Sequence, residues 1–141
     1  MPARDEAATV ASVVEGVRAT LGCAVLVVDD ASSDTTAAAA RGAGAAVLSL
    51  PLGLGAWGAT QAGIRYALRN GFTNVITLDA DGQHVPESLP LLVAAQAESR
   101  ANVVIGTCVG RLSRAKRIAW HYLRFLTGLK LADFTSGVRL Y

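Results

Sequence analysis

Charged side chains are scarce in this chain of 141 residues, making up 17% against 52% hydrophobic residues. So little charge excludes a disordered tail, because disordered segments lack the apolar surface that offsets the entropy of folding. Long apolar runs are missing as well, and no stretch approaches the roughly 20 residues of a membrane-spanning helix. The length predicts one domain over residues 1–141, since domains commonly hold about 100–150 residues.

Cysteine is almost absent. Only Cys23 and Cys108 occur, both in apolar segments and without the spacing of a disulfide framework or a metal site. We therefore expect two reduced core residues in a cytoplasmic protein. The amino terminus carries acids and no apolar stretch, so it does not resemble a signal peptide.

The few charges are unevenly divided. Residues 1–110 carry a net charge of −4 and residues 111–141 a net charge of +6. Such an asymmetry predicts two roles within one domain and an anionic partner for the basic part.

The segment 111–130 is expected to be a helix with Arg114, Arg117, His121 and Arg124 on one face, beside an aromatic and apolar stripe. One interpretation is peripheral contact with an anionic membrane surface. The other is a helix packed on the core with a solvated basic face. Nucleic acid is not expected as a partner, because the basic residues are confined to one helix and no reading module accompanies them.

The hydrophobic pattern alternates between short β-branched runs and helical spacing. Strands are expected at 24–28, 45–50, 74–78 and 102–105, and helices at 7–21, 34–41, 58–70 and 86–99. This alternation predicts an α/β fold of three layers, α/β/α, with a mostly parallel sheet. Residues 2–4 suit the end of a strand whose apolar body is missing, and the chain stops within another predicted strand, so we expect a fold truncated at both ends.

The sharpest motif is Asp79-Ala80-Asp81-Gly82-Gln83-His84, directly after a predicted buried strand. Two carboxylates at positions i and i+2 of a turn can reach one hard cation, and oxygen ligands suit Mg²⁺ or Mn²⁺. Gly82 permits a backbone that other residues resist. The alternative is a polar turn whose acids cap the next helix.

A second acidic turn, Asp29-Asp30-Ala31-Ser32-Ser33-Asp34, also links a strand to a helix. A carboxylate at the strand end can accept hydrogen bonds from a base or a ribose. The alternative, a helix cap, explains Ser33 and Asp34 but not Asp29 beside Asp30, because adjacent like charges at a buried strand end need a partner.

Residues 53–58 match the pattern G-x-G-x-x-G, and Asp79 follows Gly58 by 21 positions. This spacing is close to that of a dinucleotide-binding fingerprint, so a nicotinamide-dinucleotide protein of Rossmann type is one alternative. The simpler interpretation is a glycine loop that lets the backbone approach a ligand.

Taken in order, residues 2–6, 28–34, the glycine loop, 79–84 and 133–137 resemble motifs of the family 2 glycosyltransferases, with the dolichyl-phosphate mannose synthase-like branch as the nearest likeness. The resemblance implies a GT-A fold, a nucleotide-sugar donor and Mg²⁺ or Mn²⁺. Within it, Asp79 and Asp81 would position the metal on the diphosphate, Asp30 would hold the base, and Arg117 would face an acceptor phosphate. The residues implied to contact the nucleotide sugar are Pro2, Ala3, Glu6, Asp30, Gly55, Asp79 and Gln83.

The reaction that this resemblance implies is an inverting, metal-dependent transfer of a sugar to a polyprenyl-phosphate or glycan acceptor. Asp81 would act through the metal, Arg117 on the acceptor side, and Asp133 as general base if the acceptor is a hydroxyl. We expect this reaction in the cytoplasm, with contact at the cytoplasmic face of the membrane. Besides the nicotinamide alternative, a truncated relative that binds a nucleotide without turnover remains open.

Overall fold

Strands and helices alternate along the chain in the computed structural model, which describes residues 1–83, 86–106, 122–123, 126–128 and 136–141. The strands are β1 (Pro2–Ala3), β2 (Leu26–Asp29), β3 (Ala46–Ser49), β4 (Ile76–Thr77), β5 (Val104–Ile105) and β6 (Arg139–Leu140). The helices are α1 (Val10–Leu21), α2 (Thr36–Gly42), α3 (Gly55–Arg69) and α4 (Leu89–Ser99), with a 3₁₀ turn, η1 (Pro86–Ser88), before α4. Every strand and helix expected within residues 7–105 is therefore present.

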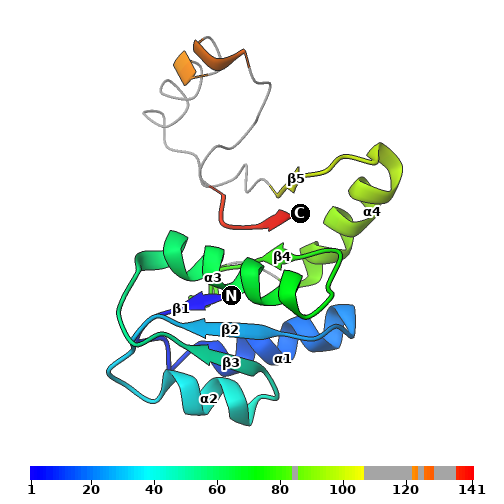
Figure 1. Cartoon of the computed structure of the whole chain (residues 1–141). Helices are drawn as coiled ribbons and strands as arrows, with labels where there is room; N and C mark the ends of the chain where they lie inside the picture. The colour runs from blue at the N-terminus through cyan, green and yellow to red at the C-terminus, as the bar shows by residue number, and fades with distance from the viewer. Residues whose placement is uncertain (84–85, 107–121, 124–125, 129–135) are drawn as a thin grey trace.

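The described strands form two three-stranded sheets. In the first, of order β1-β2-β3, all strands are parallel, and the register pairs Ala3 with Asp29 and Asp29 with Ser49. In the second, of order β4-β6-β5, β6 runs antiparallel to both neighbours. The expected parallel arrangement thus holds for the first sheet, whereas β6 reverses direction in the second (Figure 1).

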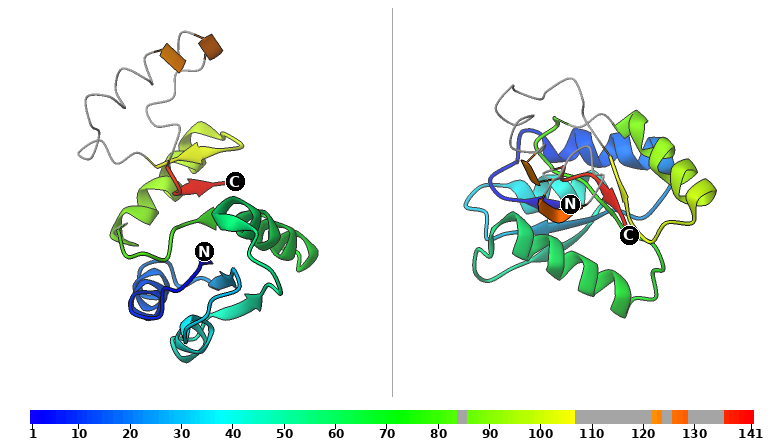
Figure 2. Two further views of the ribbon diagram at one scale, coloured as in Figure 1. Left: turned by 90° about the vertical axis from the view of Figure 1, so that its left-hand side faces the viewer. Right: turned by 90° about the horizontal axis from the view of Figure 1, so that it is seen from above.

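Helices cover both faces of the strands. Helix α3 packs against β1 and β2, while α2 packs against β2 and β3 and α1 lies against α2 and α4. Seen from above, α3 lies on one side of the strands and α1 and α4 lie on the other (Figure 2). This arrangement confirms the three-layer α/β/α fold.

The apolar stripe of α1 forms the centre of the core. Its four valines recur at helical spacing and are at most 7% exposed: Val10, Val13, Val14 and Val17. They pack with the β-branched run of β2, in which Val27 is fully buried. Burying a valine side chain contributes about 1.5–3 kcal/mol, so this layer is a main source of stability.

The expectation for Cys23 was wrong, because this side chain is exposed. Helix α1 ends at Gly22, whose φ of 60° is left-handed, and burial begins again only at Val25. Cys23 therefore lies in the turn between helix and strand rather than in the core. Cys108 lies outside the described residues.

The direction of the strands places several loops together. In Figure 1, β1, β2 and β3 point the same way, and β6 points the opposite way. Because β4 is antiparallel to β6, it shares the direction of the first sheet. The carboxyl ends of β1 to β4 consequently face one side of the molecule, which is where open α/β sheets bind ligands.

Candidate functional site

The carboxylate of Asp30 fastens the glycine loop to the end of β2. Its Oδ1 accepts the Leu54 N–H at 2.6 Å and its Oδ2 accepts the Gly55 N–H at 2.8 Å. Leu54 is the N-cap residue of α3, and its own side chain cannot form a capping hydrogen bond. Asp30 follows β2 and is 2% exposed, so it caps α3 from outside the helix. The two N–H donors in turn offset the cost of burying its carboxylate.

Helix α3 begins earlier than the sequence predicted. The glycine pattern at 53–58 was expected to precede a helix at Gly58, but α3 begins at Gly55. Gly55 has a φ of 74°, a left-handed conformation that glycine adopts without steric cost. Only Gly53 and Leu54 of the pattern thus precede the helix, and the Asp30 carboxylate binds the N–H groups of Leu54 and Gly55.

A second set of hydrogen bonds joins the loop after β1 to the loop after β2. Asp5 donates its N–H to Ser32 Oγ at 3.0 Å, and its Oδ1 accepts the N–H and the hydroxyl of Ser33 at 2.7 and 3.0 Å. Asp29 accepts the Ser32 N–H at 3.1 Å. Asp5 and Ala31 have φ values of 55° and 56°, and such left-handed non-glycine residues cluster at functional sites.

Buried Thr36 and exposed Asp34 extend this network. The Thr36 hydroxyl, fully buried, accepts the Glu6 N–H at 2.8 Å and donates to Asp34 Oδ1. Asp34 also accepts the Thr36 N–H at 2.8 Å and the Ala7 N–H at 3.1 Å. These hydrogen bonds, first that of the Thr36 hydroxyl, hold the pKa of Asp34 below its ordinary value. Asp34 thus binds the first N–H of α2, although the N-cap residue of that helix is Thr35, and Ser33 bonds to Asp5 instead.

The acids that follow β4 lie on a tight bend. Asp81 Oδ1 accepts the Gln83 N–H at 2.9 Å, and Gly82 has a φ of 70°, as the sequence predicted for this glycine. Asp79 and Asp81 are both partly exposed. Helix α4 begins after Ser88, its N-cap residue, whose own side chain makes no capping hydrogen bond.

Gly137 lies directly against Asp79. A Cβ built on Gly137 would overlap the Asp79 carboxylate, so any other residue at this position would have to displace that carboxylate. The Thr77 hydroxyl donates to the Gly137 carbonyl at 2.7 Å and fixes the same loop to β4. Gly137, the last residue of the motif at 133–137, therefore lies at the acidic bend, a contact that the sequence reasoning did not identify.

Arg139 was not identified from the sequence at all. Its guanidinium lies over the ring of Trp57, 5.7 Å from the ring centroid, and its Nε donates to the Ser136 carbonyl at 2.9 Å. Trp57 is 58% exposed on the first turn of α3. This cation–π contact joins the end of the chain to the glycine-loop side of the site.

The donor set at the bend suits a magnesium or manganese ion bound together with a phosphate. Within residues 1–83, 86–106 and the other described segments, no three His, Cys, Asp or Glu side chains gather in a way that could hold an ion by themselves. Mg²⁺ usually takes one or two carboxylates, with water and substrate phosphates as its remaining ligands. Asp79 and Asp81 meet that requirement.

Most of the residues predicted to contact a nucleotide sugar meet at the strand ends. Ala3 is paired with Asp29 and accepts the Asp30 N–H at 2.8 Å, which places β1 beside the acids of β2. Glu6 is bonded to Thr36, and Gly55 to Asp30. Pro2 precedes Ala3 in β1, while Gln83 is exposed on the acidic bend. Arg117, Asp133 and His84 lie outside the described residues.

Comparison with known proteins gives a consistent result. A model of the family described as "Glycosyl transferase family 2" matches residues 1–138. An undecaprenyl-phosphate mannosyltransferase of Micrococcus luteus is 39% identical over 132 residues, covering 83% of this chain and 54% of its own length. A polyprenol monophosphomannose synthase of Mycolicibacterium smegmatis is 32% identical over 133 residues, covering 83% of this chain and 50% of its own. The chain thus spans about half the length of these curated relatives.

Solved structures show the same likeness. The glucosyl-3-phosphoglycerate synthase of Mycobacterium tuberculosis in complex with Mn²⁺, uridine-diphosphate-glucose and phosphoglyceric acid superposes with a TM-score of 0.76 at 25% identity. The match covers 99% of this chain and 53% of the synthase chain. This likeness in structure confirms the GT-A fold implied by the sequence motifs. That enzyme was crystallised with a divalent metal and a nucleotide sugar.

The Asp30 contact generates a prediction about stability. Asp30→Asn keeps one acceptor oxygen but turns an NH₂ group toward a backbone N–H, so we expect a loss of about 1.5–3 kcal/mol in the free energy of unfolding. Urea denaturation measures this loss, and amide exchange at Leu54 and Gly55 locates it. Glu15→Gln, at an exposed position of α1, is the control and should change neither. Equal stability of the two variants, with both amides still protected, would contradict the assignment.

Gly137 generates a second prediction. In Gly137→Ala the new methyl group occupies the place of the Asp79 carboxylate, so we expect a loss of about 1–3 kcal/mol in unfolding free energy. Gly42→Ala is the matched control, because nothing lies within 4 Å of its added Cβ and α2 gains a better helix former. If urea midpoints show both alanine variants as stable as the parent, Asp79 does not lie against Gly137.

Proposed function

The chain belongs to glycosyl transferase family 2, and on that premise we propose that it transfers a sugar from a nucleoside-diphosphate sugar to a polyprenyl-phosphate or glycan acceptor, with inversion and with Mg²⁺ or Mn²⁺. The observation that carries the proposal is the pair Asp79 and Asp81 on the bend after β4, at the side where the strands end. The likeness to an undecaprenyl-phosphate mannosyltransferase supports the acceptor class.

The nucleotide is proposed to lie across the ends of β1 and β2. Pro2, Ala3 and Glu6 would line it, and Gly55 and Gln83 would approach the donor from the two neighbouring loops. Asp30 is proposed to hold the base. Each of its oxygens already accepts one amide N–H, but a carboxylate offers about four lone-pair directions, so it retains capacity for a further donor.

The diphosphate is proposed to lie at the bend after β4, where Asp79 and Asp81 would hold the metal. A bound Mg²⁺ or Mn²⁺ supplies Lewis-acid neutralisation of the charge that develops on the leaving nucleoside diphosphate. Gly137 and Thr77 position Asp79, and the Gln83 N–H positions Asp81. Such contacts would hold both carboxylates in place before substrate arrives, so that little reorganisation is needed at the moment of reaction.

The acceptor is proposed to approach from the basic part of the chain. An anionic phosphate oxygen can attack without a general base, and Arg117 is proposed to hold that phosphate. For a hydroxyl acceptor, Asp133 is proposed to remove the proton. Both residues lie outside the described segments, so these two roles rest on the sequence motifs.

Membrane contact through residues 111–130, at the cytoplasmic face, is proposed on the strength of their basic and aromatic pattern. None of the helices in the described part of the chain has the length and apolar character needed to cross a bilayer. Nucleic acid is not proposed as a partner.

We predict that Asp81→Asn weakens metal-dependent donor binding and abolishes sugar transfer. The amide removes a negative charge from the metal-binding pair, so affinity for a nucleoside diphosphate in the presence of Mn²⁺ should fall by about tenfold or more. Calorimetric titration with UDP and GDP, with and without Mn²⁺, measures binding. Transfer from UDP- and GDP-sugars to a polyprenyl phosphate measures turnover. Glu98→Gln, at an exposed position near the end of α4, is the control.

The same titrations separate the other interpretations. Binding of NAD(H) in preference to nucleoside diphosphates would favour a nicotinamide protein. Metal-dependent nucleotide binding without hydrolysis or transfer would identify a non-catalytic relative. Full, metal-dependent transfer by Asp81→Asn would refute the assigned role of the acidic bend.

A further inference from the structure

Arg139 and Trp57 connect the second sheet to the helix that covers the first. Arg139 lies in β6, where the register pairs it with Thr77 of β4. Trp57 lies in the first turn of α3, which packs against β1 and β2. The Arg139 guanidinium stands over the Trp57 ring, 5.7 Å from its centroid. This stack of two side chains therefore links the two sheets.

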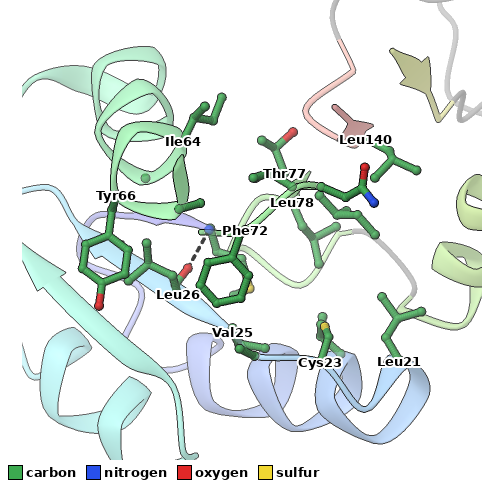
Figure 3. Close-up of a pocket in the computed structure, with 18 of the residues that line it drawn as sticks. Leu21, Cys23, Val25, Leu26, Ile64, Tyr66, Phe72, Thr77, Leu78 and Leu140 are labelled. Carbon is green, nitrogen blue, oxygen red and sulfur yellow. Dashed lines mark hydrogen bonds between the residues drawn. The ribbon is translucent and has the colours of Figure 1, made fainter. Parts of the chain in front are cut away.

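The alternation of side chains along β6 explains why Arg139 points toward α3. Its neighbours in the chain, Val138 and Leu140, are 5% and 2% exposed and belong to the core. Leu140 lines an apolar pocket together with Leu21 and Leu78, as Figure 3 shows. Because successive side chains of a strand point to opposite faces, Arg139 leaves the other face of β6 and reaches α3.

The Arg139 side chain also supports the loop that lies against Asp79. Its Nε donates to the Ser136 carbonyl at 2.9 Å. The next residue, Gly137, lies so close to Asp79 that an added Cβ would overlap the carboxylate. The Thr77 hydroxyl donates to the Gly137 carbonyl at 2.7 Å. A shift of Arg139 would thus be passed on to the residues that contact one of the two acids of the bend.

Trp57 is connected in a similar way to Asp30. The first amides of α3, at Leu54 and Gly55, bind the Asp30 carboxylate at 2.6 and 2.8 Å. Trp57 follows Gly55 by two positions, within the same helical turn. A continuous set of contacts therefore leads through the stack from the acid at the end of β2 to the acidic bend after β4.

Building on the proposed function, we propose that Trp57 and Arg139 are positioning residues, which hold the acidic bend at the spacing from Asp30 that a nucleoside diphosphate requires. In that function Asp30 holds the base, and Asp79 and Asp81 hold the metal on the diphosphate. A ligand that binds at two ends gains affinity only when the two ends stand at a distance that its own length can span. A fragment that occupies one end has no such requirement.

The chemistry of the two side chains suits this role. Indole is the best cation–π partner among the aromatic rings, and the planar guanidinium can stack on it while N–H groups in its plane donate elsewhere. Arg139 does both, because its Nε bonds to the Ser136 carbonyl while its guanidinium covers the Trp57 ring. Trp57 is 58% exposed, so its replacement removes the stack without opening the core.

The test compares Trp57→Leu, which removes the ring, with Trp57→Phe, which keeps an aromatic face for the guanidinium. Leu68→Ala is the control, because it removes another exposed apolar side chain near the far end of α3. Calorimetry with Mn²⁺ present measures the affinity of each chain for UDP, for GDP and for pyrophosphate, the fragment that occupies the bend alone. Thermal unfolding checks that each variant is folded.

We expect Trp57→Leu to weaken binding of the preferred nucleoside diphosphate by about fivefold, as for the loss of an exposed cation–π contact. Binding of pyrophosphate with Mn²⁺ should keep its parental affinity. Trp57→Phe should recover most of the loss, and Leu68→Ala should resemble the parent. Because the two residues act as a pair, Trp57→Leu should cause no further loss in a chain that already carries Arg139→Met.

Equal losses of nucleotide and pyrophosphate affinity would show that Trp57 acts on the bend itself and would overturn the positioning role. Parental nucleotide binding by Trp57→Leu, a Trp57→Phe variant as weak as Trp57→Leu, or additive losses in the double variant would overturn it as well. A parent chain without Mn²⁺-dependent binding of UDP or GDP would instead refute the proposed function, and the positioning role with it.

Discussion

The bond between the Asp30 carboxylate and the first amides of α3 is the contact on which the arrangement of the site depends. It gives two hydrogen-bond donors to a carboxylate that is almost fully buried at the end of β2, and it supplies the cap that α3 lacks in its own sequence. Because α3 packs against β1 and β2, this bond also fixes the helix that carries Trp57. The glycine loop consequently has one position relative to the acids of the parallel sheet.

The rest of the site follows from strand direction. Strands β1 to β4 end on one side, so their loops bring together Glu6, Asp29, Asp30, Asp79 and Asp81 although these residues are widely spaced in the sequence. In the described contacts, backbone N–H groups donate hydrogen bonds to the carboxylates of Asp29, Asp30 and Asp81. Such donors orient the carboxylates, which suits a site for a metal and a diphosphate.

The sequence predicted those features that depend on local pattern. The valines of α1 recur at helical spacing and are buried, and the strand runs ended in acids as expected. The sequence did not predict features that depend on a distant residue. The cap of α3 comes from Asp30, 24 positions before Leu54, and the sequence pattern therefore placed the start of α3 too late. Nor could it show that Gly137 touches Asp79 or that Arg139 stacks on Trp57, because both contacts cross long loops.

The central claim is that the bend after β4 holds a divalent metal together with a nucleoside diphosphate. Paramagnetic broadening of amide NMR signals by Mn²⁺ measures this most directly, since broadening falls steeply with distance from the ion. We predict that Mn²⁺ with UDP or GDP broadens the signals of Gly82, Gln83 and Gly137 while those of Gly22 and Gly42 stay sharp. Broadening that spares Gly82 and Gln83, or that does not depend on the nucleotide, would contradict it.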